Sequence, residues 1–175
     1  MSIYLLRHAE VSPRYKGRYY GSLDMPISEV GISQAKAIAK ELSCIKFDKI
    51  YSSNLLRAKQ TLSFIKTDAD VIYTPLLQEK SWGKHEGMSF DEIVDSGIEY
   101  KDFTQWISAL DGESLDEFLS RVKEYFFKEI YPKKDRDILV VTHGGVIKII
   151  LQELQGLSLQ DAFSISIDYA NYIKI

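Results

Sequence analysis

The stretch DILVVTHGGVIKIILQEL, residues 137–154, decides the fold. Its first part, DILVVTH, is a nearly unbroken apolar run, which is typical of a β-strand buried on both faces of a sheet. GVIKIILQEL follows at once and has the composition of a largely buried helix. A buried strand that leads directly into a helix is the repeating unit of parallel α/β sheets.

The same alternation extends towards both ends of the chain. Strands are predicted at 3–6, 47–53 and 71–74, and Pro75 suits an edge position for the last of these. Apolar residues recur at helical spacing in three further stretches, which are 32–42, 55–65 and 115–130. The final segment, 164–175, alternates apolar and polar residues and is predicted to add one or two strands.

These elements predict one domain over residues 1–175, a three-layer α/β/α sandwich with a mostly parallel central sheet. Glycines interrupt residues 82–112, which we expect to form a small cover over the sheet edge. Ser28 or Ser33 can cap the first helix. Capping boxes are predicted at Ser89 with Glu92 and at Ser114 with Glu117.

Composition narrows the classes of function. The net charge of −3 gives no basic footprint for nucleic acid, and the single cysteine, Cys44, excludes an internal disulfide and a cysteine metal cluster. The chain shows neither a secretory leader nor an apolar run near the length of a membrane span, so we expect a cytoplasmic protein without a membrane partner. Whether it forms a homodimer stays open.

Two of the three histidines occupy matching positions at strand ends. His8 follows the first strand and His143 follows the strand at 137–143. Ligands of open parallel sheets bind outside the carboxyl ends of the strands, so this pairing favours a shared site. Gly144 begins the next helix, where free backbone N–H groups can bind an anion.

Charged residues at the same edge indicate the ligand. Arg7 lies at the end of the first strand, and Arg57 lies in the first turn or two of the helix that follows the strand at 47–53, which places both at the same sheet edge. Two guanidinium groups beside a helix N-terminus suit a phosphate dianion. Glu79 and Glu86 follow the third strand, and a carboxyl near a phosphate can act as a general acid. Spacing does not decide between these two carboxylates. His85 is expected to be exposed in a loop.

Five stretches of the chain resemble a known family. LLRHAE, SSNLLRAKQT, LLQEKSWGKHEG, DGESLDEFLSRV and VVTHGG are similar, in order and spacing, to the motifs of the phosphoglycerate-mutase-like branch of the histidine phosphatase superfamily. The stretch GRYYGSLDMPISEVGISQA is also similar to this branch. The match looks closest to the compact α-ribazole phosphatase-like members.

The resemblance implies a role for each matching residue. His8 would be the nucleophile that forms phosphohistidine. Arg7, Arg57 and His143 would bind the phosphoryl group together with the backbone N–H of Gly144. Glu79 would be the proton donor and Glu86 a supporting residue. The arginines would supply the positive charge, so neither a metal nor a cofactor is expected.

Three positions depart from the family pattern. Ala9 replaces a usual glycine, which requires a backbone φ that is not positive. Val11 replaces a hydroxyl residue and Arg14 a common asparagine. Arg14, Lys16 or Arg18 can supply the missing phosphate donor. Aromatic residues of the surrounding loops, Tyr20 among them, can contact the substrate or only pack under the loops.

The resemblance favours hydrolysis of a small phosphorylated metabolite such as α-ribazole 5′-phosphate, in the cobalamin pathway. The cover is short compared with the mutases of the family and should admit water. Three alternatives stay open: mutase-type phosphoryl transfer, a non-catalytic module that binds a phosphorylated ligand, and an iron site built from His8, His143 and Glu79. The arginines argue against the iron site, because they would repel the cation.

Overall fold

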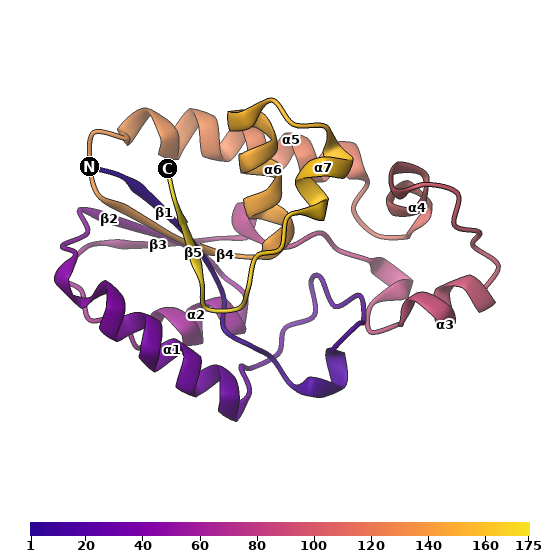
Figure 1. Cartoon of the computed structure of the whole chain (residues 1–175), viewed down its shortest axis with the longest axis horizontal. Coiled ribbons are helices and arrows are strands. Elements are labelled where there is room, and N and C mark those ends of the chain that lie inside the picture. Colours follow the sequence, from indigo (N-terminus) through magenta and orange to yellow (C-terminus); the bar gives the residue numbers. More distant parts are fainter.

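A five-stranded sheet forms the centre of the molecule, as the computed structural model of residues 1–175 shows (Figure 1). Its order is β3–β2–β4–β1–β5. The strands are β1 (Ile3–Arg7), β2 (Lys49–Ser53), β3 (Val71–Thr74), β4 (Ile138–Thr142) and β5 (Tyr172–Lys174). The first four in this order pair in parallel, and β5 pairs antiparallel with β1. The predicted mostly parallel sheet, with 71–74 at its edge, is confirmed.

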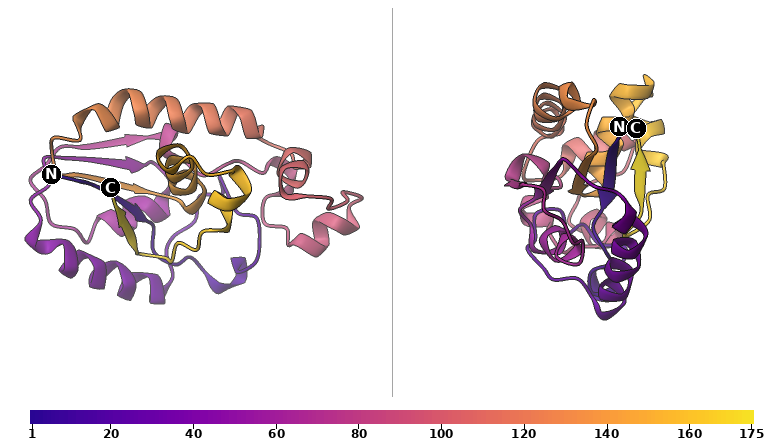
Figure 2. Two further views of the ribbon diagram at one scale, coloured as in Figure 1. Left: turned by 45° about the horizontal axis from the view of Figure 1, so that its top comes forward. Right: turned by 90° about the vertical axis from the view of Figure 1, so that its left-hand side faces the viewer.

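Helices cover both faces of the sheet (Figures 1 and 2). One face packs against α1 (Glu29–Glu41) and α2 (Leu56–Leu62), and the other against α5 (Leu115–Tyr125) and α6 (Gly144–Gln155). Side chains alternate between the two cores: Leu5 and Val140 belong to the α5–α6 core, whereas Leu6 and Val141 belong to the α1–α2 core. This alternation explains why the strand sequences are apolar throughout, and the predicted three-layer sandwich is confirmed.

Helix starts follow the predicted caps. Ser28 accepts a hydrogen bond from the Gly31 N–H and caps α1, whereas Ser33 lies inside that helix. Full capping boxes form at Ser89 and at Ser114, as predicted. The helix predicted over 115–130 ends early as an α-helix, because residues Phe126–Ile130 form a π-helical turn.

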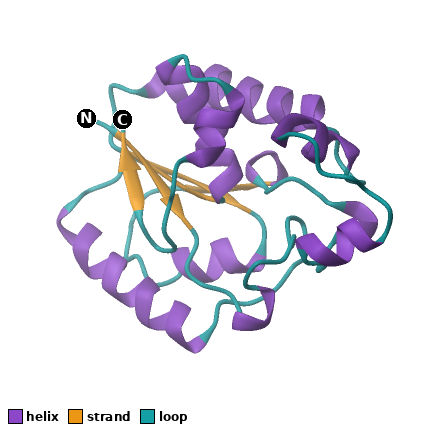
Figure 3. Cartoon of the chain, turned by 45° about the vertical axis from the view of Figure 1, so that its right-hand side comes forward, coloured by secondary structure: helices purple, strands orange, loops and turns teal.

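Residues 83–112 form an arm at one end of the molecule, at the right in Figure 1 and turned towards the viewer in Figure 3. It contains α3 (Phe90–Asp95) and α4 (Phe103–Ala109), the second of which the sequence did not predict. A small separate core, built around Ile93 and Trp106, holds the arm together. The loop between β1 and α1 reaches it, since the Tyr19 N–H donates to the Met88 carbonyl.

The expectation that His85 is exposed is wrong. The side chain is buried in the arm, and its Nδ1 accepts a hydrogen bond of 2.9 Å from the Asp111 N–H. Burial lowers the pKa of His85, and the neighbouring Lys84 lowers it further. A neutral ring with a free lone pair on Nδ1 is what this contact requires.

Only part of the final segment forms a strand. The helix α7 (Leu159–Ser164), capped by Ser158, takes up Ser164, and β5 is limited to three residues. The residues between α7 and β5 are irregular and cross the ends of the central strands (Figure 1). None of the helices combines the length and the apolar character that a membrane crossing requires.

Candidate active site

The carboxyl ends of β1 and β4 bring His8 and His143 together. Arg7 pairs in register with Thr142, and the His8 N–H donates to the Thr142 carbonyl at 2.9 Å. Each histidine is the next residue after its strand, so the two ring centroids lie 5.1 Å apart. The strand-end pairing expected from the sequence therefore exists in the structure.

His8 presents a neutral nucleophilic nitrogen. Its Nδ1 lies 2.7 Å from the Ala9 carbonyl, which only accepts hydrogen bonds, so Nδ1 carries the ring proton. The lone pair is then on Nε2, where the Arg57 Nε donates at 3.3 Å. Burial, reinforced by the positive charges of Arg57 and Arg7, holds the pKa of His8 well below 6.5. The ring is unprotonated at neutral pH and can attack an electrophile.

His143 lies behind His8 and is fully buried. Its Nε2 lies 2.8 Å from Ser53 Oγ, at the end of β2. Ser53 Oγ already accepts from the Leu55 N–H, so its own proton can be donated to Nε2, and this arrangement leaves the imidazole proton on Nδ1. Nδ1 is buried and has no partner within the protein, which makes it a free donor for an anion. Burial, with Arg57 as the next cause, lowers the pKa of His143 well below 6.5.

Two guanidinium groups flank His8. Arg57, in the first turn of α2, is fully buried and donates to the carbonyls of Gly21 at 2.5 Å and Leu23 at 2.7 Å. Arg7 donates from Nη1 to the Ile167 carbonyl, while its Nε is buried without a partner. A buried cation without a carboxylate partner is costly, so Arg57 favours an anionic ligand, and the half-buried Arg7 adds a second positive charge beside it.

Glu79 faces this cluster from the segment after β3. Its Oε2 accepts from the Gly145 N–H at 2.9 Å, and its Oε1 accepts from the Lys80 N–H at 3.2 Å. A Cβ at Gly145 would lie 2.2 Å from Oε1, so only glycine admits the carboxylate there. At Gly144 a Cβ would have only an ordinary contact, 3.6 Å from Arg7 Nε. Gly145, the second glycine of HGG, thus leaves room for the Glu79 carboxylate and donates a hydrogen bond to it.

Glu86 does not line the cavity that His8 lines. Its Oε1 accepts three hydrogen bonds, two from Ser22 and one from the Trp82 N–H. These contacts tie the loop after β1 to the segment that carries Glu79. The geometry therefore separates the two carboxylates that spacing alone left undecided, and places Glu79 at the site.

The cavity at these residues has a volume of about 150 Å³. Three arginines, His8, Glu79, three aromatic residues and two glycines line it: Arg7, His8, Arg18, Tyr19, Tyr20, Gly21, Arg57, Glu79, Trp82 and Gly144. Positive, negative and nucleophilic groups thus converge on a space that suits a phosphoryl group with a small substituent.

The residues that depart from the family pattern differ in whether they line the cavity. Arg14 lies outside the cavity, exposed and stacked on Tyr15, whereas Arg18 lines it and is held by Glu92. Ala9 avoids a positive φ, as its side chain requires, and its N–H donates to Thr61 Oγ1. Val11 is buried and does not line the cavity.

Sequence reasoning missed Tyr169 and the role of Ser53. Tyr169 places its ring 3.9 Å from Arg7 Cζ, although it is far away in sequence and carries no motif. Ser53 could have been found, since it ends β2 in the way that His143 follows β4. The structure gathers no group of three His, Cys, Asp or Glu side chains with the geometry of a metal site.

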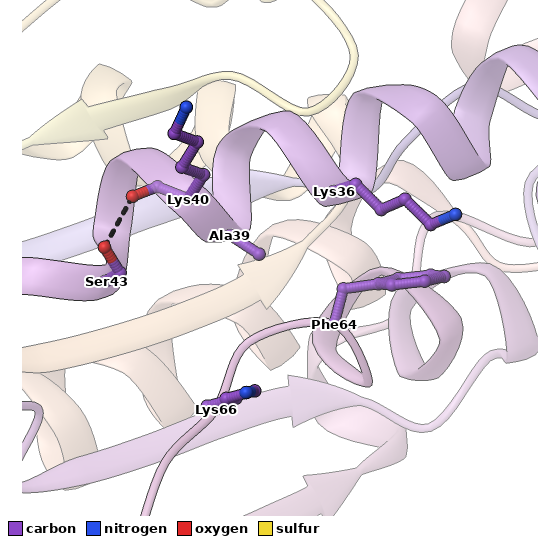
Figure 4. Close-up of a pocket in the computed structure, with 6 residues that line it drawn as sticks. All are labelled: Lys36, Ala39, Lys40, Ser43, Phe64 and Lys66. Atoms are coloured by element: carbon purple, nitrogen blue, oxygen red, sulfur yellow. Dashed lines mark hydrogen bonds between the residues drawn. The ribbon is translucent and has the colours of Figure 1, made fainter.

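A larger cavity, of about 410 Å³, lies elsewhere, between α1 and the segment after α2 (Figure 4). It is lined by Lys36, Lys40, Lys66, Ala39, Ser43 and Phe64. Figure 4 shows Lys36 extended over Phe64, while Lys40 points away from it, so the ammonium groups do not converge. Cavity volume alone does not identify the candidate site, because the smaller cavity is the one that Arg7, His8, Arg57 and Glu79 line.

Comparisons with known proteins agree with this geometry. The family model described as histidine phosphatase superfamily (branch 1) matches residues 3–175. Phosphoserine phosphatase 1 from Hydrogenobacter thermophilus is 33% identical over 184 residues, covering 100% of this chain and 86% of the relative. The α-ribazole phosphatase structure from Shigella flexneri has a TM-score of 0.85 and 25% identity, covering 99% of this chain and 89% of that one.

A phosphoglycerate mutase shares the fold. The structure from Bacillus anthracis has a TM-score of 0.81 at 22% identity, covering 99% of this chain and 86% of that one. At this identity the likeness concerns the arrangement of helices and strands. The expected phosphoglycerate-mutase-like fold is confirmed.

Proposed function

The chain belongs to the histidine phosphatase superfamily, and on that premise we propose that it hydrolyses small phosphomonoesters through a phosphohistidine intermediate at His8. One observation carries the proposal. The unprotonated Nε2 of His8, two arginines without carboxylate partners and the Glu79 carboxyl group all meet in one small cavity.

In the first step, the phosphoryl oxygens contact Arg7, Arg57, the Nδ1–H of His143 and the N–H of Gly144. The His8 Nε2 attacks phosphorus and the ester P–O bond breaks. Glu79 gives its proton to the departing alkoxide. Phosphoryl transfer passes through a loose transition state, so charge stabilisation by the arginines provides most of the catalysis.

In the second step, Glu79, now ionised, accepts a proton from water as that water attacks phosphorus. The N–P bond breaks, the electron pair returns to His8 Nε2, and inorganic phosphate leaves. General acid–base help of this kind contributes about 10²- to 10⁴-fold. The arginines supply the positive charge, so the proposed enzyme requires no metal ion.

The proposed substrate is a small phosphorylated metabolite. α-Ribazole 5′-phosphate is one candidate, supported by the likeness to the Shigella enzyme, and phosphoserine is another, supported by the Hydrogenobacter relative. The cavity of about 150 Å³ favours the smaller leaving group. Mutase-type transfer remains the alternative. The cytoplasmic location and the absence of nucleic-acid and membrane partners stay predictions.

A substrate panel tests the proposal. We expect the chelator-treated protein to release phosphate from at least one small phosphomonoester, and His8→Ala to release none above background. Tyr73→Phe, a change on the far edge strand, should leave the rate unchanged and serves as the control. If the native protein hydrolyses no member of a broad panel, the proposed activity is wrong.

A further inference from the structure

The segment between α7 and β5 is tied to the start of the active site. Arg7 donates from Nη1 to the Ile167 carbonyl at 2.5 Å and from its backbone N–H to the Asn171 carbonyl at 3.0 Å. The Ala170 N–H donates to the His8 carbonyl at 3.2 Å. Three hydrogen bonds thus join this irregular segment to two consecutive residues of the proposed phosphate site.

Tyr169 projects from that segment onto Arg7. The Arg7 Cζ lies 3.9 Å from the centroid of the Tyr169 ring, and the ring centroid of His8 lies 5.6 Å away. The Tyr169 hydroxyl is 2.5 Å from the Tyr20 hydroxyl, and the Tyr20 ring lies 5.6 Å from Arg57 Cζ. The two tyrosines therefore connect the two guanidinium groups across the cavity.

The backbone beside Tyr169 is strained. Ala170 has φ of 49° and is the only non-glycine residue of the chain with a positive φ. Such a conformation persists only where the surrounding contacts enforce it, and it occurs most often at functional sites. Here the hydrogen bond from Ala170 to the His8 carbonyl holds the turn that presents Tyr169 to Arg7.

These contacts restrict how the Arg7 guanidinium can bind a ligand. Its Nη1 is fixed by the Ile167 carbonyl and one face of the guanidinium is covered by Tyr169. Its Nε is buried without a partner. The Nε edge is therefore the part of Arg7 that faces an anion.

We propose that Tyr169 is a positioning residue, which fixes the Arg7 guanidinium by stacking so that its Nε edge binds the phosphoryl group. The inference rests on the proposed phosphatase function. Cation–π contacts between arginine and tyrosine are stabilising within about 6 Å of the ring centroid, and the stack of Arg7 on Tyr169 at 3.9 Å lies well inside this limit. Loss of the stack should weaken phosphate binding about tenfold.

Competitive inhibition by inorganic phosphate tests this role. Tyr169→Leu should raise both the inhibition constant for phosphate and KM about tenfold. It should change kcat less than about threefold, because Arg7 itself remains and the cost of fixing its guanidinium is met when the phosphate binds. Tyr169→Phe keeps the ring and should stay within about threefold of the native protein. A merely structural role would instead lower the active fraction, and hence kcat, at unchanged KM.

Tyr73→Leu is the matched control. Tyr73 also lies near a cation, with Lys59 Nζ 5.8 Å from its ring, but it is on the edge strand away from the cavity. Its replacement should leave KM and the phosphate inhibition constant unchanged. This comparison separates the Arg7 contact from a general effect of removing a tyrosine.

If Tyr169→Leu does not fold, the same contact can be tested by placing a series of fluorinated phenylalanines at position 169 and measuring phosphate affinity. Each added fluorine weakens the negative face of the ring while its shape is nearly conserved, so phosphate affinity should fall stepwise with fluorination. Equal affinity across the series, in a protein that still hydrolyses its substrate, would overturn the role of Tyr169 alone. A native protein that neither binds phosphate nor hydrolyses any phosphomonoester would overturn the proposed function and this inference with it.

Discussion

At the scale of single residues, the site depends on the tautomers of two histidines. A backbone carbonyl fixes the proton of His8 on Nδ1, and the Ser53 hydroxyl favours the Nδ1 proton of His143. The first ring is thereby a nucleophile and the second a donor. Both rings are neutral at neutral pH, since burial keeps both pKa values well below 6.5. The two histidines therefore differ in role only because His8 presents its Nε2 lone pair to the site, whereas His143 presents its Nδ1–H.

Gly145→Ala tests the position of the proton donor. The new Cβ would meet Glu79 Oε1 at 2.2 Å and displace the carboxylate. We expect kcat for an alkyl phosphate to fall about 10²-fold, as it should in Glu79→Gln, because the departing alkoxide then lacks a proton. The rate of the first turnover of 4-nitrophenyl phosphate is the internal control, because its leaving group needs no proton and departs before Glu79 activates water in the second step. Equal losses on both substrates would contradict the role of Glu79.

At the scale of elements, α5 fixes the segment that carries Glu79. Arg121 forms a bidentate pair with Glu113, at 2.7 and 2.8 Å, and donates from Nη1 to the carbonyls of Leu76 and Gln78. Both charged side chains are only 18% exposed. Glu113 of the motif DGES therefore orients Arg121, and Arg121 in turn holds the backbone immediately before Glu79.

Arg121→Met should remove this support. Charge-assisted hydrogen bonds that are shielded from water contribute about 1.5–3 kcal/mol each, so we expect the free energy of unfolding to fall by at least about 2 kcal/mol. Lys123→Met, on the same helix, removes a more exposed pair with Glu153 and should cost less than about 1 kcal/mol. Urea denaturation of both variants measures the difference, and equal losses would contradict the argument.

The elements also show how far the sequence predicts the site. Strand ends place His8, His143 and Arg57 correctly, because parallel strands align their carboxyl ends wherever they lie in the sequence. Loop residues are different. Arg14 points away while Arg18 lines the cavity, and Tyr169 arrives through an irregular segment whose path depends on contacts with Arg7. No local pattern encodes such long-range contacts.

At the scale of the whole molecule, the buried neutral histidines link stability to pH. The folded protein keeps the pKa values of His8 and His143 well below 6.5, whereas in the unfolded chain both return to about that value. As pH falls through 6.5, the unfolded state therefore binds more protons than the folded state. The folded state loses stability in that range, and its full stability is present above it.

The expected loss is measurable by chemical denaturation in phosphate-free buffer. Between pH 7.5 and 5.5, each histidine should cost about 1.4 kcal/mol of unfolding free energy, and the two together about twice that. His143→Asn should remove about 1.4 kcal/mol of this loss, whatever its effect on stability at pH 7.5, and His8 and His85, whose pKa values are also lowered, account for the histidine contribution that remains. A stability that rises on acidification from pH 7.5 would show that the rings are protonated in the folded protein.

Trapping the covalent intermediate tests the central claim most directly. The protein is mixed for milliseconds with a phosphomonoester labelled with ³²P, quenched in alkali, digested, and the labelled peptide is sequenced. We predict one label per chain that is stable to base and labile to acid, located on His8 and absent from His8→Ala. Label on another residue, or rapid hydrolysis without any label on His8, would contradict the account.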